Sequence, residues 1–202
     1  LKKVLPLLKD TARIDCFNAL SYEYILSGKK DLAEYYADLA YEDSKKRNYI
    51  QGIAISFSRK SYIARKFYDD FVISEQMAKA SLRWFEQTAD NREYDNTYNY
   101  LMDALFAQSK FEEAMQYLEE RYSNAMQSGD TLKILKALHR IFAISRLSKK
   151  NKKSFLFTQQ AYDLALKANN KIWIANSLYN MAQLYMLVED YPTALFYFRK
   201  VI

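Results

Sequence analysis

Residues 17–24 read FNALSYEY, and four later stretches of the chain resemble them. These stretches are FSRKSYIA at 57–64, YNYLMDAL at 98–105, LHRIFAIS at 138–145 and LYNMAQLY at 178–185. Their first residues lie 40 or 41 positions apart. A period this regular is typical of proteins that stack copies of one small structural unit. The sequence therefore predicts a repeat fold, whose extended surface favours binding over catalysis.

The composition favours helices over strands. Half of the 202 residues are hydrophobic and 16% are aromatic, which is ample for a continuous core. Only three glycines and two prolines interrupt the chain. Tyrosine is abundant, with 18 residues, whereas valine is scarce, and this balance is typical of amphipathic helices with aromatic faces.

The net charge of +6 is spread along the chain and forms no dense cationic stripe. The basic runs at 44–47 and 149–153 fall between apolar-periodic segments, where a solvated loop is the favoured interpretation. A patch for nucleic acid or anionic lipid stays the alternative at both runs. We therefore expect no direct nucleic-acid binding by this chain, and membrane contact only through a segment outside it.

The single cysteine, Cys16, excludes an internal disulfide and a cysteine-based metal site. The sequence has no signal peptide and no apolar run near the roughly 18 residues of a membrane span. It begins with Leu1, and its last helix-forming stretch runs to Ile202 without a stop signal. We therefore expect a fragment of a longer protein.

Each repeat divides into two amphipathic helices, as the last repeat illustrates. Its first helix carries an apolar stripe at three- and four-residue spacing, made by Ala175, Leu178, Ala182 and Tyr185. Residues 189–192 then break the pattern, and Pro192 suits the first turn of a new helix. The second helix carries another stripe, made by Ala194, Phe198 and Val201. The predicted repeats are residues 11–50, 51–91, 92–130, 131–170 and 171–202, expected to form one all-α domain over residues 1–202.

Small residues predict where the two helices of a hairpin approach each other most closely. They are Ser21, Ser61 and Ala182 in first helices, and Ala33, Ala114 and Ala194 in second helices. Paired helices roughly 8–10 Å apart leave no room for a long side chain at the contact. The second repeat keeps the pattern most loosely, and we place Ile73, Met77 and Ala80 on its inner side. Turn and cap chemistry between repeats is expected at Asn48, Asp90-Asn91, Gly129-Asp130 and Asn169-Asn170.

This spacing resembles the tetratricopeptide repeat (TPR). The family pattern of bulky, small and aromatic positions is met by Leu178, Ala182, Tyr185, Ala194, Phe198 and Val201. The common repeat has about 34 residues, so the longer period seen here implies longer helices. The resemblance implies a right-handed α-solenoid of about five TPR-like helical hairpins that acts by protein interaction.

A second resemblance covers residues 10–24, which read DTARIDCFNALSYEY. This segment looks like the start of the TPR sensor regions of Bacteroidetes regulators, which are histidine kinases or helix-turn-helix proteins. The resemblance implies an input or dimerising segment, periplasmic in a membrane sensor kinase and cytoplasmic otherwise. It carries no kinase activity over to this chain.

The sequence contains no catalytic or metal-binding signature. Its glycines, Gly28, Gly52 and Gly129, stand too far apart to form a phosphate-binding loop. His139 is the only histidine, which excludes two-histidine metal motifs. It is either a polar contact to a ligand or an ordinary surface residue. We therefore expect no enzymatic activity, no cofactor and no metal.

The first helices of a TPR-like array line its concave side. Positions one, five and eight after the bulky residue are expected to face inward there. The predicted binding groove is lined by Asn18, Tyr22, Ser58, Tyr62, Arg65, Asn99, Asp103, His139, Arg146, Tyr179 and Gln183. Tyrosine and arginine offer large contact areas with polar tips, as peptide-binding surfaces do. The alternative, that these side chains only face water, stays open.

Two functions are compatible with this pattern. The first is a non-catalytic protein- or peptide-interaction module, the sensory or scaffolding TPR region of a bacterial signal-transduction regulator. The alternative is a cytoplasmic peptide-pheromone receptor or adaptor that binds a peptide in the groove. The expected partner is a protein or peptide, and an apolar end face also predicts self-association.

Overall fold

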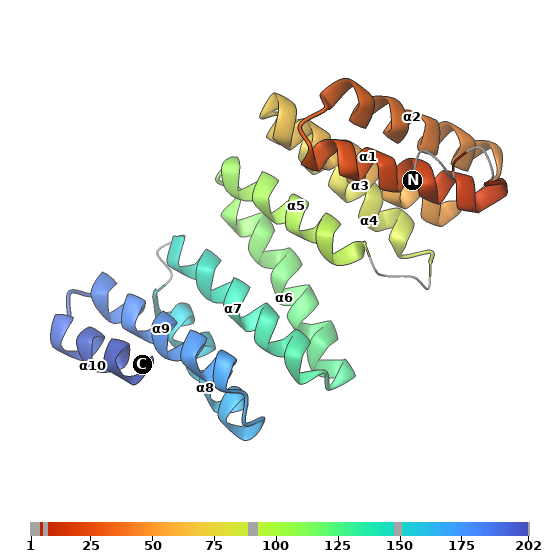
Figure 1. The fold of residues 1–202 in the computed structure, drawn as a ribbon. Coiled ribbons are helices and arrows are strands. Elements are labelled where there is room, and N and C mark those ends of the chain that lie inside the picture. Colours follow the sequence, from red (N-terminus) through yellow and green to blue (C-terminus); the bar gives the residue numbers. More distant parts are fainter. Residues whose placement is uncertain (1–4, 6–7, 89–92, 148–150, 202) are drawn as a thin grey trace. The chain divides into compact units, whose positions relative to one another are not determined.

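A computed structural model describes residues 5, 8–88, 93–147 and 151–201. The described residues form ten α-helices and no strand: α1 (Asp10–Leu26), α2 (Lys30–Lys46), α3 (Ile50–Tyr68), α4 (Phe71–Phe85), α5 (Tyr94–Ala107), α6 (Phe111–Ser128), α7 (Thr131–Leu147), α8 (Asn151–Lys167), α9 (Lys171–Leu187) and α10 (Tyr191–Val201) (Figure 1). The chain divides into two compact units. The N-terminal unit is Leu1–Ser109 with α1 to α5, and the C-terminal unit is Lys110–Ile202 with α6 to α10.

Within each unit the helices pack as consecutive hairpins. Each helix contacts the next one along the chain. In addition, α3 contacts both α1 and α5 in the N-terminal unit, and α7 contacts α9 in the C-terminal unit. The odd-numbered helices therefore form one continuous row in each unit, which is the packing of stacked helical repeats. The predicted fold class, all-α with stacked TPR-like hairpins, is confirmed.

Four predicted repeats correspond to one hairpin each. They are 11–50 (α1 and α2), 51–91 (α3 and α4), 131–170 (α7 and α8) and 171–202 (α9 and α10). The third predicted repeat, 92–130, contains α5 of the N-terminal unit and α6 of the C-terminal unit. The predicted boundary at residues 91 and 92 lies outside the described residues. The single domain over residues 1–202 stays a prediction.

The small residues lie where the helices of a hairpin meet. All six that the pattern singled out are at most 1% exposed. The Ser21 hydroxyl donates a hydrogen bond to the carbonyl oxygen of Ala33 at 2.8 Å. The Ser61 hydroxyl likewise donates to the carbonyl oxygen of Ser74 at 2.8 Å. A hydroxyl can reach the neighbouring backbone only because the two helices approach closely, so the predicted contact positions are confirmed.

In the second repeat the predicted register of the second helix is wrong by one residue. Ser74, Ala78 and Ser81 are completely buried, whereas Ile73 is 45% exposed. The helices α3 and α4 meet at two serines, whose hydroxyl oxygens lie 3.1 Å apart. An isoleucine would not fit at this contact, so the short polar residue takes the inner position and the apolar one faces outward.

The turns between repeats use the predicted residues. A positive φ, between 50° and 67°, is adopted by Asn48, Gly129 and Asn169. The Asp130 carboxylate accepts backbone hydrogen bonds at the start of α7, and these bonds lower the pKa of Asp130. The Asn170 side chain accepts from the backbone of Trp173 at the start of α9. The predicted turn and cap residues at these three places are therefore confirmed. The fourth predicted place, Asp90-Asn91, lies outside the described residues.

Candidate functional site

Three tyrosine rings form a row across the odd-numbered helices of the N-terminal unit. Tyr22 of α1 lies 6.3 Å from Tyr62 of α3, measured between ring centroids. Tyr62 in turn stacks on Tyr100 of α5 at 4.8 Å, with 19° between the ring planes. Tyr100 is 7% exposed, and burial raises its pKa far above the ordinary value. The row therefore has an anchored end at Tyr100 and partly exposed rings at Tyr22 and Tyr62.

An arginine and an aspartate border this row. The Arg65 guanidinium carbon lies 5.2 Å from the centroid of Tyr62 and 5.5 Å from that of Tyr100. Arg65 also forms an ion pair with Asp103 of α5 at 2.5 Å. The side chains of Arg65 and Asp103 are 29% and 46% exposed, so both charges reach the surface. The structure thus brings together four predicted site residues from three helices: Tyr22, Tyr62, Arg65 and Asp103.

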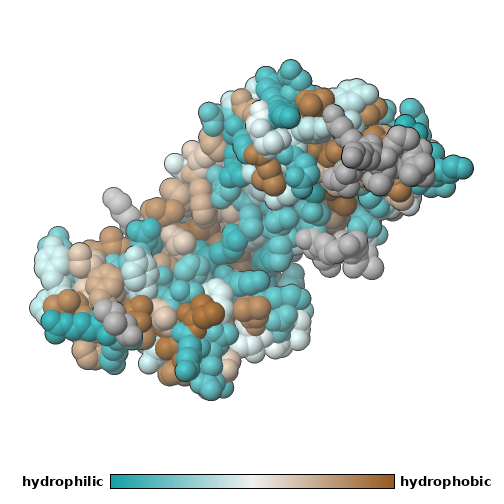
Figure 2. All heavy atoms as spheres, in the orientation of Figure 1, coloured by the Kyte–Doolittle hydropathy of each residue, from teal (hydrophilic) through white to brown (hydrophobic). Residues whose placement is uncertain are grey.

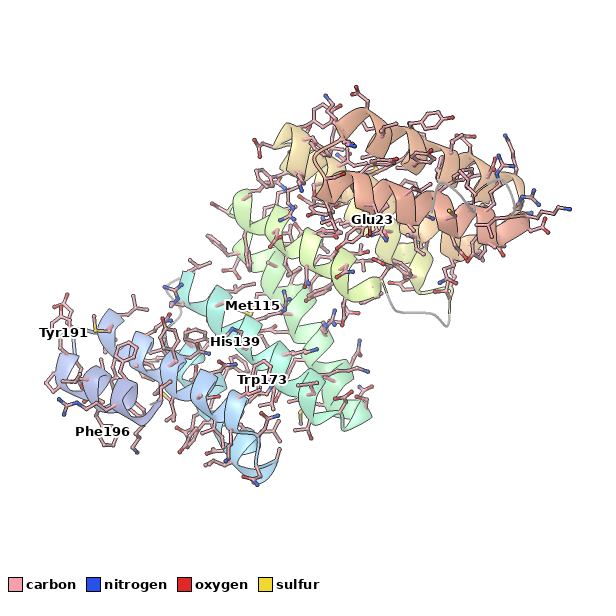
Figure 3. The ribbon with its side chains drawn as sticks, in the orientation of Figure 1. Glu23, Met115, His139, Trp173, Tyr191 and Phe196 are labelled. Carbon is pink, nitrogen blue, oxygen red and sulfur yellow. The ribbon has the colours of Figure 1, made fainter. Side chains whose placement is uncertain are left out.

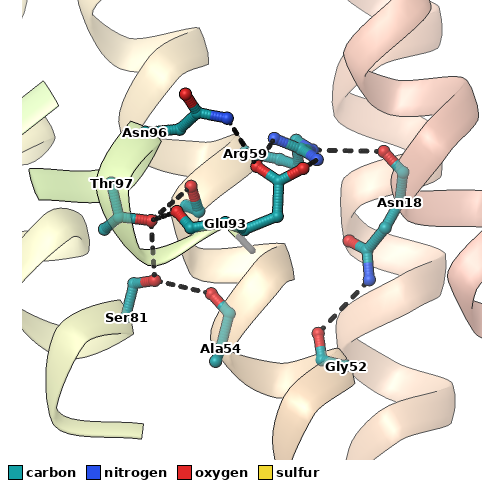
Figure 4. Close-up of polar contacts among 9 residues, drawn as sticks. Asn18, Gly52, Ala54, Arg59, Ser81, Glu93, Asn96 and Thr97 are labelled. Carbon is teal, nitrogen blue, oxygen red and sulfur yellow. Dashed lines mark hydrogen bonds and ion pairs between the residues drawn. The ribbon is translucent and has the colours of Figure 1, made fainter. Parts of the chain in front are cut away.

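Beneath the row lies a buried ion pair that the sequence analysis missed. The Arg59 side chain is 4% exposed, and its guanidinium lies 4.6 Å from the centroid of Tyr22. It contacts both carboxylate oxygens of Glu93, at 3.0 and 3.1 Å, and donates from Nε to the carbonyl oxygen of Asn18 (Figure 4). This arrangement fixes the position of Tyr22 relative to α3 and α5.

Two predicted lining residues are buried instead of exposed to solvent. Asn18 is 2% exposed, and its amide nitrogen donates to the carbonyl oxygen of Gly52 at 3.4 Å. Ser58 is completely buried and accepts a hydrogen bond from the hydroxyl of Thr97 at 2.7 Å. The placement of Asn18 and Ser58 on an open surface is therefore wrong. Both directly follow a bulky residue, and both form a hydrogen bond to the next odd-numbered helix, so they lie in the contact between these helices. Asn99 is partly exposed.

In the C-terminal unit, His139 lies among aromatic and amide groups. Its Nδ1 is 2.9 Å from the amide nitrogen of Asn180, and its ring meets Trp173 edge-on at 5.9 Å. Figure 3 labels His139 and Trp173. An amide nitrogen can only donate, so Nδ1 accepts and the imidazole carries its proton on Nε2. Burial lowers the pKa of His139, and the nearby Arg140 charge lowers it further. His139 is therefore a neutral, partly buried polar contact between α7 and α9.

The other predicted residues of the C-terminal unit are spread along α7 and α9. Tyr179 is 48% exposed and contacts Phe198 of α10 edge-on at 5.6 Å. Gln183 and Arg146 are partly exposed. The Nε of Arg146 is buried and has no hydrogen-bond partner among the described residues. The predicted residues that contact one another as a group therefore lie in the N-terminal unit, on the surface made by α1, α3 and α5.

The described residues contain neither a candidate metal site nor a candidate membrane span. Within the described ranges, no three histidine, cysteine, aspartate or glutamate side chains are grouped so that they could hold a metal ion. Of the helices in those ranges, none has both the length and the apolar character needed to cross a bilayer.

Comparisons with known proteins identify the type of fold. No family model and no curated protein matches this sequence. The crystal structure of nearly identical TPR-like repeats from a Podosopora anserina kinesin light chain protein aligns with a TM-score of 0.77 at 12% identity. That alignment covers 96% of this chain and 95% of the other.

Two longer proteins have similar structures. The apo form of RapI aligns with a TM-score of 0.77 and 16% identity, over 96% of this chain and 54% of RapI. Aspartyl phosphate phosphatase F from Bacillus subtilis aligns with a TM-score of 0.71 and 16% identity, over 98% of this chain and 61% of the phosphatase. This chain thus spans a little over half the length of these two proteins. The similarity shows that the chain has a TPR-like helical-repeat fold.

Proposed function

We propose that this chain is a non-catalytic module that binds a protein or peptide segment on the surface of α1, α3 and α5, hereafter the α1–α3–α5 face. One observation carries this proposal: the partly exposed Tyr22 and Tyr62 rings lie next to the surface ion pair of Arg65 and Asp103. The comparisons support the proposal through the fold alone, because TPR-like repeats present their first helices as an extended surface.

The chemistry of this face suits a polypeptide ligand. Tyrosine rings provide rigid contact area at a low cost in conformational entropy, and arginine stacks on such rings while it presents hydrogen-bond donors. Arg65 and Asp103 offer donors and acceptors side by side, which matches the alternating groups of a peptide backbone. The buried pair of Arg59 and Glu93 holds the helices in place, so the surface is organised before a ligand arrives.

We further propose that the module is the sensory or scaffolding region of a bacterial signal-transduction regulator. The support is the repeat array together with the resemblance of residues 10–24 to the start of such regions. The second candidate, a cytoplasmic receptor that binds a peptide directly, draws support from the similar folds of RapI and phosphatase F. The gene sequence on both sides of this chain separates the two candidates. A membrane span followed by a kinase or DNA-binding domain would favour the first.

Self-association is a further part of the proposal. Large apolar side chains at least 46% exposed gather on the hairpin of α9 and α10: Ile172, Tyr179, Met186, Leu187, Tyr191, Leu195 and Phe196. Hydrophobic residues are visible over these helices in Figure 2. Exposed apolar clusters of this kind favour contact with another protein surface.

Isothermal titration calorimetry with peptide libraries tests the α1–α3–α5 face. The variant combines Tyr62→Ala with Arg65→Ala, and we expect it to lose binding that the wild-type chain shows. The matched control combines Tyr35→Ala with Arg47→Ala, which removes the same residue types from exposed positions on and just after α2. Circular dichroism establishes that both variants are folded. Equal binding by the wild type and the Tyr62/Arg65 variant would discard the α1–α3–α5 face as the site.

A further inference from the structure

A second surface of the N-terminal unit has the properties of a binding site, and it shares no residue with the α1–α3–α5 face. It is a groove of about 470 Å³ lined by α2, α3 and the start of α4, hereafter the α2–α4 groove. We propose that the α2–α4 groove binds a short cationic, amphipathic helix of a partner protein. The floor of the groove, its charge and its length each support this occupant.

The floor of the groove is apolar and unfilled. Ala37 of α2 and Ala64 of α3 are 0% and 5% exposed, and their methyl groups are too short to fill the space between the helices. Ile63 closes the floor, and Ile73 of α4 lies at its edge with 45% of its surface exposed. An apolar side chain of a ligand would cover the exposed surface of Ile73 and remove it from water, which is favourable.

The rim of the groove carries an excess of negative charge. Among the described lining residues, three are carboxylates, Glu34, Asp38 and Asp70, and Lys60 is the cation. Lys60 is paired with Asp38 at 2.7 Å, and Glu34 accepts a hydrogen bond from the Tyr68 hydroxyl. This local charge is opposite to the net charge of +6 of the whole chain. Charge complementarity therefore favours a ligand with lysine or arginine side chains.

The acidic character continues along α2 beyond the groove itself. Four carboxylates recur at three- and four-residue spacing, so they share one side of the helix: Asp31, Glu34, Asp38 and Glu42. On the other side of the groove, Asp69 precedes Asp70 at the entry to α4. Lys30 lies over the Tyr68 ring at 4.1 Å, at one end of this stripe. Basic side chains on both edges of a docked helix would thus meet carboxylates.

The length of the groove sets the size of the ligand. On α3 it extends from Lys60 to Tyr68, which is about 12 Å at the helical rise. This length accepts roughly two turns of a helix, with apolar residues spaced three or four apart towards the floor. The occupant is therefore a short helix with an apolar stripe bordered by lysine or arginine.

A fluorescence titration of the full chain tests the proposal. The probe is a labelled helical peptide with leucine at three- and four-residue spacing and lysine on both borders, and its counterpart has glutamate in place of lysine. We expect only the lysine peptide to bind, and its affinity to fall as salt rises. Ile73→Lys should weaken binding roughly tenfold or more, because it removes apolar contact and adds like charge.

The matched control is Val72→Lys. Val72 is 53% exposed and directly precedes Ile73, but it does not line the groove. Val72→Lys should therefore keep the affinity of the wild-type chain. Equal loss of binding in both variants would overturn the proposal, since the loss would then come from the added positive charge and not from contact in the groove.

Two further outcomes would also overturn it. Loss of peptide binding in the Tyr62/Arg65 variant would place the peptide on the α1–α3–α5 face, whereas retained binding supports the α2–α4 groove independently of that face. If the lysine peptide does not bind and Ile73→Lys instead dissociates a dimer of the chain in light scattering, the groove holds a second copy of this protein.

Discussion

The Arg59 guanidinium of α3 contacts both carboxylate oxygens of Glu93, the residue that directly precedes α5, at 3.0 and 3.1 Å. The Arg59 side chain is 4% exposed and that of Glu93 is 27% exposed. Glu93 also accepts a hydrogen bond from the side chain of Asn96 at 3.1 Å. The pair therefore fixes α5 against α3, and the tyrosine row of the α1–α3–α5 face rests on this contact.

Loss of the Glu93 carboxylate should destabilise the N-terminal unit. Glu93→Gln leaves the Arg59 charge buried without its counter-ion, and we expect the free energy of unfolding to fall by about 3 kcal/mol. The double variant Arg59→Met, Glu93→Gln removes the buried charge as well, so it should lose less than the single variant. Urea denaturation followed by circular dichroism measures both. A double variant less stable than Glu93→Gln would show that the ion pair itself, and not the unpaired charge, dominates.

The hairpins could be predicted because their contacts depend on short-range spacing. A small residue must recur wherever two helices of one hairpin meet, and Ser21 and Ser61 mark these points directly in the sequence. The inner face of α4 could not be predicted from hydrophobicity. The close contact between α3 and α4 requires a short side chain, so Ser74 is buried there and the more hydrophobic Ile73 is exposed. Sequence periodicity thus identifies which segments pair, and the details of close approach decide the register.

Only some residues of the candidate site could be predicted from the sequence. Tyr22, Tyr62 and Arg65 follow the repeat pattern, so their common face could be deduced by counting positions. The pairing of Arg59 with Glu93 joins residues 34 apart across two hairpins, and no spacing rule within one repeat predicts it. Counting positions within the repeat did not identify Tyr100. It lies three residues, or about one helical turn, before the position on α5 that this count selects.

Gly52 should resist replacement, although alanine normally stabilises a helix by about 0.5–1 kcal/mol relative to glycine. A methyl group at this position of α3 would collide with the Ser44 hydroxyl and would lie 2.5 Å from the Tyr49 ring and 2.9 Å from Ile14. We therefore expect Gly52→Ala to lower the free energy of unfolding by roughly 1–3 kcal/mol. Thermal or urea unfolding of the variant provides the measurement.

A second substitution separates this collision from a general effect on the helix. The Ser44 hydroxyl is buried and has no hydrogen-bond partner among the described residues. Ser44→Ala alone should therefore change stability little, and combined with Gly52→Ala it should restore part of the lost stability. A combined variant as unstable as Gly52→Ala would mean that Ser44 is not the limiting contact.

His139 should make the stability of the C-terminal unit depend on pH. Burial lowers the pKa of His139 in the folded chain below the value of about 6.5 for an exposed imidazole. The unfolded chain therefore binds more protons between these two values, and stability rises with pH in that window. The contribution of neutral His139 to the free energy of unfolding is fully present above about pH 6.5. It is lost as the pH falls through the pKa that His139 has in the folded chain.

The non-titrating variant His139→Gln isolates this contribution. Urea unfolding of both proteins between neutral and mildly acidic pH also includes the titration of carboxylates, which the two proteins share. We expect the stability of the wild type to fall more steeply with decreasing pH than that of His139→Gln. Parallel curves would show that the pKa of His139 is the same in the folded and unfolded chains.

Self-association should depend on the apolar surface of α9 and α10. Phe196 is 53% exposed, and its ring lies under the Lys200 ammonium at 4.2 Å, so Phe196→Glu removes apolar area without opening the core. We expect concentration-dependent light scattering of the wild type to indicate oligomers and that of Phe196→Glu to indicate monomers. Leu156→Glu is the matched control, because Leu156 is a 56% exposed residue of α8, outside this hairpin. A monomeric wild type at high concentration, or equal dissociation by both substitutions, would rule out this surface as the contact.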